Sequence, residues 1–241
     1  MSSDAPRALI LAAGKGVCLG ELTACVLKPL LLVRGKPVIV WLIEDLRAGG
    51  VRELCINLHH LPEAIPAALG DGAALGVHLT YARETELLGT AGALRNFRDR
   101  LTAPCFVVYG DTLRSVDYAA LLAQHRATGA AATIALHTVD DPASAGVVTL
   151  GADRRITGFV EKPQGMAGPA LANAGVYCLG QAALDCAAAL PAPCDFAYDV
   201  FPRLLAQGEP LYGFPLAGLV IDIGTTTRYA EAEARWTGAT P

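Results

Sequence analysis

The sequence predicts an α/β fold whose sheet is mostly parallel and doubly wound, with an antiparallel addition at one edge. In the first half of the chain, short apolar runs alternate with helical patterns, which is typical of parallel sheets. In the second half, several strands between residues 131 and 160 follow one another without a helix between them. The 241 residues suffice for one large domain with a full hydrophobic core.

The individual elements follow from apolar runs and from helix start and stop signals. The expected strands are 8–12, 52–58, 77–82, 104–109, 131–138, 146–150, 155–160, 173–179, 210–214 and 219–222. The expected helices are 37–48, 90–101, 117–128, 181–189, 198–207 and 226–236. The first helix opens with Pro37 and stops before Gly49-Gly50, as the preferences of helix termini predict.

Composition excludes several classes of function. A net charge of −4 argues against general nucleic-acid binding, and no apolar run is long enough to span a bilayer. The opening Met-Ser-Ser-Asp-Ala-Pro-Arg leads directly into the first expected strand, so we expect no signal peptide. The seven cysteines form no Cys-x-x-Cys pair, and several lie in apolar strands. We therefore expect free or buried thiols in a cytoplasmic protein with no nucleic-acid or membrane partner.

A glycine loop follows the first expected strand. Ala8–Ala12 has the pattern of a buried parallel strand, and Gly14 and Gly16 let the backbone turn sharply and approach a ligand closely. Backbone N–H groups in such a loop suit a nucleotide phosphate, and Lys28 adds a point charge for a second anion. No Gly-Lys-Ser/Thr follows at the spacing of a Walker loop. Taken alone, the same glycines also fit a simple tight turn.

Two aspartates lie at the ends of expected strands. Asp111 follows the apolar run that ends at Tyr109-Gly110, and Asp222 lies within the apolar Leu219–Ile223. Ligands gather at the carboxyl ends of strands in open α/β sheets, and an unpaired carboxylate in an apolar strand is costly. Two such carboxylates could share one Mg²⁺. The alternative for Asp111 is a cap on the turn into the next helix.

The complete N-terminal segment is more specific than its glycines. It reads Ala-Leu-Ile-Leu-Ala-Ala-Gly-Lys-Gly at 8–16 and Leu-Lys-Pro-Leu-Leu-Leu-Val-Arg-Gly-Lys-Pro-Val-Ile at 27–39. This segment resembles the signature of the sugar-1-phosphate nucleotidylyltransferases, Leu-Ala-Ala-Gly-x-Gly-Thr-Arg-Leu-x-Pro-Leu-Thr, then Pro-Lys-Pro-Leu, then Gly-Lys-Pro. Five further segments match the family in order, so the resemblance covers residues 8 to about 236. They are 84–94, 109–111, 159–163, 173–177 and 219–225.

The resemblance implies a Rossmann-like sheet, the nucleotide-diphospho-sugar transferase fold, in one nucleotidyltransferase domain over residues 1–241. Within it, about 1–130 would be the nucleotide-binding half and about 131–241 the sugar-binding half. The implied reaction is Mg²⁺-dependent transfer of a nucleoside monophosphate from an NTP to a sugar 1-phosphate, which releases pyrophosphate. The sequence does not fix the oligomeric state, and a homodimer is the assembly that we consider beside the single chain.

The resemblance also implies roles for individual residues. The nucleotide would contact Leu11, Ala12, Ala13, Gly14, Gly16, Glu84, Gly89 and Thr90. The sugar phosphate and the sugar would contact Lys28, Gly110, Glu161, Lys162, Asn173 and Gly175. The metal ligands would be Asp111 and Asp222, and the catalytic residues Lys15, Lys28 and Asp111.

The segment Glu84–Leu94 is the expected base-reading element. Its wording looks most like mannose-1-phosphate and heptose-1-phosphate guanylyltransferases, which favours GTP. A carboxylate such as Glu84 or Glu86 could read the paired donors of guanine, which uracil and thymine lack. The helix expected from about Thr90 would bring its N-terminus towards the ligand. A uridylyl- or thymidylyltransferase is the alternative within the family.

The chain departs from the family pattern at one charged position. Cys18 stands where the family has the arginine that binds the departing pyrophosphate, and Val17, Glu21 and Leu27 replace Thr, Pro and Pro. Losing such a donor typically costs on the order of 10²–10³ in rate. Lys15 is left to supply part of the charge, although a point charge does not reproduce a guanidinium fork. A non-catalytic binding or regulatory homologue is therefore the second hypothesis.

Overall fold

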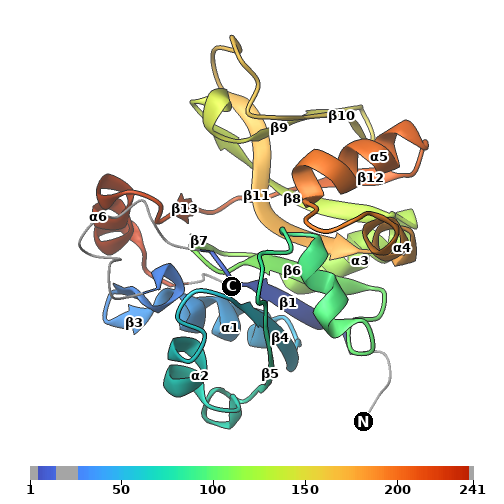
Figure 1. The fold of residues 1–241 in the computed structure, drawn as a ribbon. Helices are drawn as coiled ribbons and strands as arrows, with labels where there is room; N and C mark the ends of the chain where they lie inside the picture. The colour runs from blue at the N-terminus through green and yellow to red at the C-terminus, as the bar shows by residue number, and fades with distance from the viewer. Residues whose placement is uncertain (1–4, 15–26, 239–241) are drawn as a thin grey trace. The chain divides into compact units, whose positions relative to one another are not determined.

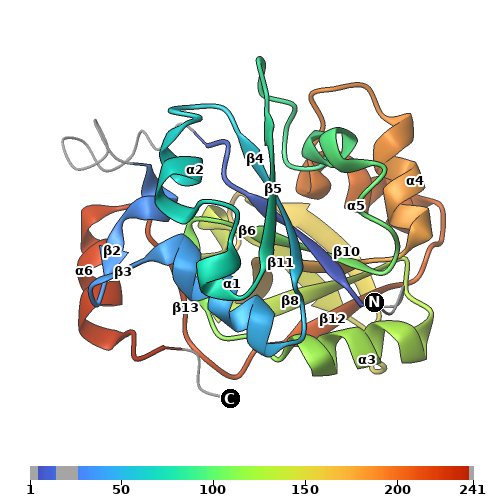
Figure 2. The same cartoon turned by 90° about the horizontal axis from the view of Figure 1, so that it is seen from below.

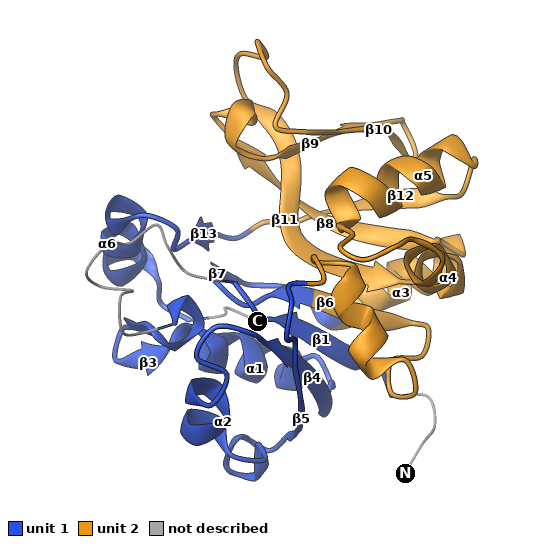
Figure 3. Ribbon diagram, in the orientation of Figure 1, with its two compact units in different colours: residues 1–87, 108–118, 218–241 blue, residues 88–107, 119–217 orange. Residues whose placement is uncertain are grey.

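The computed structural model describes residues 5–14 and 27–238 of the chain (Figure 1). These residues form two compact units (Figure 3). Unit 1 combines the described parts of Met1–Leu87, Val108–Tyr118 and Gly218–Pro241, and unit 2 combines Leu88–Val107 and Ala119–Ala217. Each unit is thus assembled from segments that are far apart in the sequence. The predicted division of roles at about residue 130 stays a prediction.

Unit 1 is built on a parallel sheet. Strands β1 (Arg7–Leu11), β4 (Glu53–Leu58) and β5 (His78–Arg83) pair in parallel, in the order β1-β4-β5. Helices α1 (Val38–Ala48) and α2 (Ala64–Leu69) lie beside β4 and β5 (Figures 1 and 2). Strands β1 and β4 are mostly buried runs, as strands covered on both faces require, whereas only Leu79 of β5 is buried.

The C-terminal part of unit 1 joins segments from both ends of the chain. Strand β13 (Val220–Asp222) pairs antiparallel with β7 (Thr112–Arg114). Helix α6 (Thr226–Arg235) follows β13, and its Tyr229 hydroxyl donates to Leu32 O at 2.6 Å. Leu32 belongs to the small ladder of β2 (Leu32–Val33) and β3 (Lys36–Pro37), which is preceded by the 3-10 turn η2 (Lys28–Leu30). A second 3-10 turn, η3 (Ala73–Leu75), precedes β5.

Unit 2 is built mainly on antiparallel strands. Strand β11 (Ala170–Leu179) pairs antiparallel with β8 (Ala132–Val139) and β9 (Gly146–Leu150), and β9 pairs with β10 (Ile156–Glu161). Strand β12 (Leu211–Pro215) adds to β8 in parallel. The remaining helical elements are α3 (Tyr118–Thr128, its first residue in unit 1), η4 (Gly92–Phe97), η5 (Pro142–Ser144), α4 (Gln181–Ala189), η6 (Phe196–Val200) and α5 (Phe201–Ala206).

The core of unit 2 contains a cluster of aromatic side chains. Tyr177 lies edge-on to Phe201, with ring centroids 4.9 Å apart, and Phe196 stacks on Phe201 at 5.6 Å. Phe159 of β10 contacts the same Phe201 ring. These contacts tie β10 and β11 to η6 and α5, because aromatic pairs in such arrangements contribute beyond their buried area.

Most sequence-predicted elements are confirmed, with boundaries shifted by a few residues. One is wrong in type, because the helix expected over 90–101 is only the short 3-10 helix η4. Helix 198–207 begins with one π-helical turn, η6, before α5. Four short elements, α2, β2, β3 and β7, were not predicted, because they are too short for a clear periodic pattern.

Two further expectations are tested by the described residues. Among them, no helix has both the length and the apolar character needed to cross a membrane. Cys55, Cys105, Cys178, Cys186 and Cys194 are buried and form no disulfide, which agrees with the expectation of thiols for these five. Cys18 and Cys25 lie outside the described residues.

Candidate active-site residues in the two units

Asp111 lies close to the carboxyl end of β1. It follows Gly110, whose N–H donates to Leu11 O at 2.9 Å. A Cβ atom on Gly110 would lie 2.7 Å from the same oxygen, so only glycine fits this close approach. The half-buried Asp111 thus follows β6 (Cys105–Tyr109), as the sequence predicted, and Gly110 anchors it beside the carboxyl end of β1.

Strand pairing brings Asp222 next to Asp111. In the β7–β13 ladder Asp222 lies opposite Thr112, and Ile223 N–H donates to Asp111 O at 3.3 Å. Asp222, the last residue of β13, and Asp111, in the turn just before β7, thus come together from distant parts of the chain. The predicted cap on a following helix is not what holds Asp111, because β7 follows it.

The charges around Asp222 favour a bound cation. Partial burial raises the pKa of the Asp222 carboxyl, and the like charge of Asp111 raises it further. Lys28, Arg228 and the Gly224 N–H lower the same pKa without cancelling the rise. A divalent cation between the carboxylates would relieve this repulsion, so these residues fit a metal. Among the described residues no group of three or more His, Cys, Asp or Glu side chains could hold one, so substrate oxygens would complete the coordination.

A buried amide connects the start of the glycine loop to Glu84. Ala12 N–H donates to Asn57 Oδ1 at 2.9 Å, and Asn57 Nδ2 donates to Glu84 Oε1 at 2.8 Å. Asn57 and Glu84 are only 3% and 4% exposed. Buried polar groups that satisfy one another in this way rigidify their surroundings. Glu84 therefore positions the loop through Asn57.

The described part of the loop offers its backbone to solvent at one position. Ala12 and Ala13 are buried, whereas Gly14 is exposed and has open space where a Cβ atom would lie. The predicted residues Lys15 and Gly16, and Cys18 with its departure from the family pattern, lie outside the described residues. Among the described candidates, unit 1 thus holds Leu11, Ala12, Ala13, Gly14, Lys28, Glu84, Gly110, Asp111 and Asp222, and unit 2 holds Gly89, Thr90, Glu161, Lys162, Asn173 and Gly175.

In unit 2, Glu161 ends β10 opposite Gly146 of β9. A Cβ atom on Gly146 would lie 2.5 Å from Glu161 Oε2, so the glycine leaves room for the carboxylate. Partial burial raises the pKa of Glu161, the adjacent Lys162 lowers it and Asp195 raises it. Lys162 has φ of 47°, a left-handed conformation rare for lysine, and its side chain is exposed.

Asn173 and Gly175 form a bulge in β11. The register with β8 shifts between Asn173 and Tyr177, and Gly175 has φ of 70°. Asn173 Oδ1 accepts from Gly175 N–H at 2.8 Å, and Asn173 Nδ2 donates to the Tyr177 hydroxyl at 2.7 Å. The amide orientation is thereby fixed before any ligand binds.

Gly89 and Thr90 belong to a backbone clamp, defined as Leu88–Gly92 hydrogen-bonded to Cys194–Phe196. Cys194 N–H donates to Leu88 O, while Ala91 and Gly92 N–H donate to Cys194 O, at 2.9 to 3.1 Å. Gly89 has φ of 80°, and a Cβ atom there would overlap Cys194 O.

The expected helix N-terminus near Thr90, pointing to a ligand, is wrong, because the clamp takes its place. Thr90 donates to Asp195 Oδ1 through both its N–H at 3.0 Å and its hydroxyl at 2.8 Å, and the hydroxyl accepts from Phe196 N–H. The N–H groups that a helix would leave free are used within unit 2. This also explains why an α-helix does not start near Thr90.

Two residues of these arrangements were missed in the sequence analysis. Asn57 carried a usable signal, because it is a lone amide near the end of an apolar strand, the place where ligands gather in such sheets. Asp195 carried none, because it lies in a loop and its partner Thr90 is 105 residues away.

Comparisons with known proteins agree with this architecture. The family model described as nucleotidyl transferase matches residues 7–238. A probable mannose-1-phosphate guanylyltransferase of Oryza sativa is 37% identical over 229 residues, covering 92% of this chain and 62% of the relative. The mannose-1-phosphate guanylyltransferase of Mycobacterium tuberculosis is 32% identical over 238 residues, covering 97% and 65%. The chain thus spans less than two thirds of the length of these relatives.

Solved structures show the same fold. HddC from Yersinia pseudotuberculosis, crystallised with GMP-PN, has a TM-score of 0.80 at 25% identity and matches 95% of this chain and 99% of that one. A putative glucose-1-phosphate thymidylyltransferase from Bacillus anthracis, crystallised with sucrose, has a TM-score of 0.86 at 25% identity, with 95% and 94% covered. The predicted nucleotide-diphospho-sugar transferase fold is confirmed. With its mostly parallel first half, its antiparallel addition and a family match over nearly its whole length, the chain belongs to the nucleotidyl transferase family.

Proposed function

We propose that this chain transfers a nucleoside monophosphate from an NTP to a sugar 1-phosphate, giving an NDP-sugar and pyrophosphate. The observation that carries the proposal is the β7–β13 pairing, which gathers Asp111 and Asp222 within the electrostatic reach of Lys28. Two carboxylates with one amine nearby suit a metal-bound phosphate chain better than a neutral ligand.

The chemistry asks for positioning more than for proton transfer. An oxygen of the sugar phosphate attacks the α-phosphorus, and the bond from that phosphorus to the pyrophosphate breaks in line. The attacking oxygen is already anionic, so no general base is needed. The residues of the chain hold the two anions together and neutralise charge, which is the main protein contribution to phosphoryl transfer.

Asp111 and Asp222 are the proposed ligands of a divalent cation, and Mg²⁺ is the ion that we propose. When bound, Mg²⁺ supplies charge neutralisation at nucleotide phosphate oxygens. The aspartates hold it, Lys28 faces the sugar phosphate, and the loop from Leu11 through Gly14 to Gly16 holds the nucleoside and phosphates. Lys15 adds charge beside the phosphate chain.

GTP is the proposed nucleotide. The relatives from rice and Mycobacterium tuberculosis are named guanylyltransferases, and the HddC crystals contain a guanine nucleotide. In the chain itself, Glu84 supports the glycine loop through its hydrogen bond with Asn57. The clamp holds the segment of Gly89 and Thr90 in a fixed backbone conformation. Thymidylyl transfer is the second candidate, favoured by the name of the Bacillus anthracis neighbour.

The sugar 1-phosphate is assigned to unit 2 residues together with Lys28 and Gly110. The fixed Asn173 amide and the half-buried Glu161 carboxylate suit sugar hydroxyls, and Gly175 leaves space for the ring. The exposed Lys162 ammonium suits the sugar phosphate. These contacts discriminate sugars by hydrogen-bond pairing, which rejects wrong partners strongly when groups are buried.

A non-catalytic homologue is the alternative that Cys18 supports. The deciding experiment measures Mg²⁺-dependent pyrophosphate release with four NTPs crossed against a panel of sugar 1-phosphates, for the native chain and for Cys18→Arg. Release by the native chain with one NTP supports the proposal and names the base. If the native chain releases no pyrophosphate and the Cys18→Arg variant does, the result supports a homologue that kept its binding site and lost its catalytic activity.

Location and assembly complete the proposal. A cytoplasmic location is supported by the five free, buried cysteines, which suit a reducing compartment. A homodimer is tested by light scattering on the purified chain, where a mass of twice 25.0 kDa supports it and 25.0 kDa contradicts it.

A further inference from the structure

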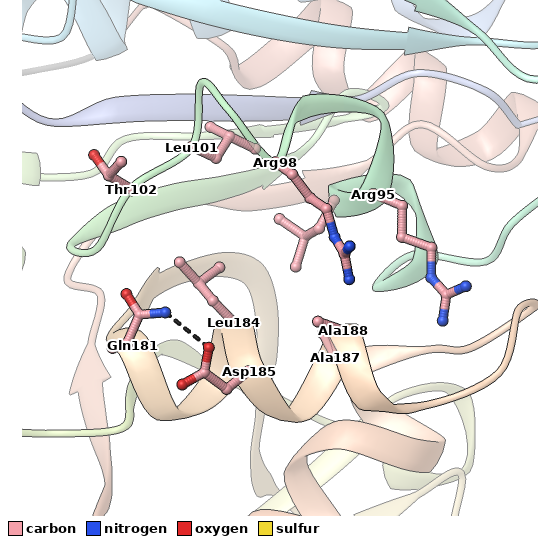
Figure 4. A pocket seen from close by; sticks show the side chains of 10 residues that line it. Arg95, Arg98, Leu101, Thr102, Gln181, Leu184, Asp185, Ala187 and Ala188 are labelled. Carbon is pink, nitrogen blue, oxygen red and sulfur yellow. Dashed lines mark hydrogen bonds between the residues drawn. The ribbon is translucent and has the colours of Figure 1, made fainter.

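Unit 2 contains a cavity that none of the proposed substrate-binding residues lines. Its volume is about 370 Å³, and it lies between η4 with its following turn and helix α4 (Figure 4). Small-molecule sites in proteins begin at about this size. Its lining residues, within 94–102 and 181–188, are separate in sequence from Glu161 and Asn173.

The walls of the cavity are aliphatic on both sides. Leu94 and Leu101 come from the η4 side, and Leu184 and Ala187 come from α4. Ala187 and Ala188 have no side chain beyond Cβ, which leaves open the space that larger residues would fill. An apolar body of a ligand would contact carbon atoms on both walls and lose its hydration there.

Two arginine side chains place positive charge on one side of the cavity. Figure 4 shows Arg95 and Arg98 extending from the η4 side towards α4. The Arg95 guanidinium donates to Leu190 O at the end of α4, which fixes it. Arg98 is exposed and forms no hydrogen bond or ion pair with any described residue.

The acidic group on the lining is already engaged. Asp185 Oδ1 accepts from Gln181 Nε2 at 2.8 Å, one helical turn away on α4 (Figure 4). The two arginines and one aspartate leave a net positive charge at the cavity mouth. A cavity with apolar walls and an unpaired guanidinium favours a ligand with one anionic end.

We propose that this cavity binds a small amphipathic organic anion, with a carboxylate or phosphate on Arg98 and Arg95 and an apolar body between Leu94 and Leu184. Arginine suits either head group, because its planar fork can donate two parallel hydrogen bonds. The cavity is therefore a second ligand site, distinct from the residues that the proposed reaction uses.

Both walls of the cavity lead directly into the clamp. Helix η4 starts two residues after Thr90, and the chain runs from the end of α4 through Leu190 to Cys194. A ligand that bridges η4 and α4 holds the two sides of the clamp together. Occupancy should consequently slow the exchange of the Ala91 and Gly92 amide hydrogens, which donate to Cys194 O.

The binding experiment uses 1-naphthyl phosphate and 1-naphthoate as probes, with neutral 1-naphthol as the matched probe without charge. Methyl NMR of the full chain, with saturating GTP present to occupy nucleotide-binding residues, locates the bound probe. We expect shifts of the Leu94, Leu101 and Leu184 methyls with both anions, much weaker binding of 1-naphthol, and weaker binding of the anions at high salt. The phosphate and carboxylate arms distinguish the two head groups by affinity.

Four variants make the test specific. Arg98→Ala should raise the Kd of the anionic probes about tenfold, as expected for loss of a charge-assisted hydrogen bond. Ala188→Phe should fill the cavity and abolish binding. Two controls should leave the Kd unchanged: Arg203→Ala removes an exposed arginine elsewhere in unit 2, and Ala189→Phe adds the same ring at an exposed position of α4 outside the lining.

Several results would overturn the inference. Equal affinity for 1-naphthol, shifts away from the three leucines, or equal loss of binding in Ala189→Phe would show that the cavity is not a site for anions. Self-association that Ala188→Phe abolishes, without probe binding, would identify the cavity as a contact between copies of the chain. Probe binding without slower exchange at Ala91 and Gly92 would remove the link to the clamp.

Discussion

The two units hold their candidate residues by different means. In unit 1, Asp111 and Asp222 come together through strand pairing between distant segments, and their like charges are only partly balanced by Lys28 and Arg228. In unit 2, Glu161 and Asn173 are oriented by local turns, at the left-handed Lys162 and in the β11 bulge.

This difference separates two tasks. Paired carboxylates in unit 1 are destabilised until a cation arrives, so that site suits metal and phosphate charge. Amide and carboxylate groups with fixed hydrogen bonds in unit 2 suit neutral hydroxyls, which need geometry more than charge. Substitutions in unit 1 should therefore act on turnover, and substitutions in unit 2 on affinity for the sugar phosphate.

The largest expected effect is on turnover in unit 1. Asp111→Asn removes one metal ligand and should lower kcat by about 10²–10³-fold, with little change in unfolding temperature. Pyrophosphate release is measured in the native chain or, if that is silent, in the Cys18→Arg background. Asp99→Asn, an exposed aspartate of unit 2, is the control and should keep full activity. Full activity of Asp111→Asn would refute its metal role.

The next effect is the pH dependence of stability in unit 1. Burial raises the pKa of Asp45 to about 7, although the Val116 N–H and Arg114 lower it. Because the folded-state pKa exceeds the unfolded value, the contribution of Asp45 is complete below about pH 4 and is lost as pH rises through 7. The Asp45→Asn variant keeps an acceptor for the Val116 N–H but does not titrate. Between about pH 4 and pH 7, its free energy of unfolding relative to that of the native chain should therefore rise by up to about 1.4 kcal/mol per pH unit. Urea unfolding at several pH values checks this, and parallel curves would contradict it.

Unit 2 should show the opposite dependence through His125. Burial, together with the smaller effect of the Arg126 charge, lowers the pKa of His125 to about 4, and the ring forms a hydrogen bond with Thr133 Oγ1 at 3.0 Å. Its stabilising contribution is complete above about pH 6.5 and is lost as pH falls through 4. His125→Asn should lower stability at pH 7 but make it less sensitive to acid over this range. Unchanged acid sensitivity in urea titrations would count against a buried neutral imidazole.

The clamp offers a test within unit 2 that does not depend on pH. Asp195→Ala removes the acceptor for the Thr90 N–H and hydroxyl, and should lower the free energy of unfolding by about 1–3 kcal/mol. Asp153→Ala removes an acceptor in an exposed turn and should change it by less than about 0.5 kcal/mol. Equal effects of the two substitutions would show that the clamp adds no special stability.

The smallest expected effect is on sugar-phosphate affinity. Lys162→Ala should raise the KM for the sugar 1-phosphate about tenfold and leave the KM for the NTP nearly unchanged. Arg154→Ala is a matched control, because Arg154 is also an exposed basic residue of unit 2 with positive φ, 66°. A rise in both KM values for Lys162→Ala would contradict the assignment of Lys162 to the sugar phosphate alone.

The sequence alone predicted most strands, because buried strands in this fold are apolar runs bounded by polar residues. It predicted Asp111 and Asp222 as strand-end carboxylates that could share one cation, and the family resemblance implied the same pair. The strand pairing that brings them together was not predicted, since β7 and β13 are about half the chain apart. The prediction of a helix over 90–101 was wrong because hydrogen bonds to Cys194 and Asp195 override the local helical preference. Such long-range partners leave no periodic signal in the sequence.

The most direct test of the shared cation site is calorimetric titration with a non-hydrolysable GTP analogue, with and without Mg²⁺. The native chain is compared with Asp111→Asn, Asp222→Asn and the double variant. If the two aspartates share one cation, Mg²⁺ should tighten binding of the analogue in the native chain, either substitution should remove this gain, and the double variant should lose no more. Without Mg²⁺, the variants should bind the analogue more tightly than the native chain, because a repelling charge is gone. An unchanged Mg²⁺ effect in both single variants would contradict the shared site.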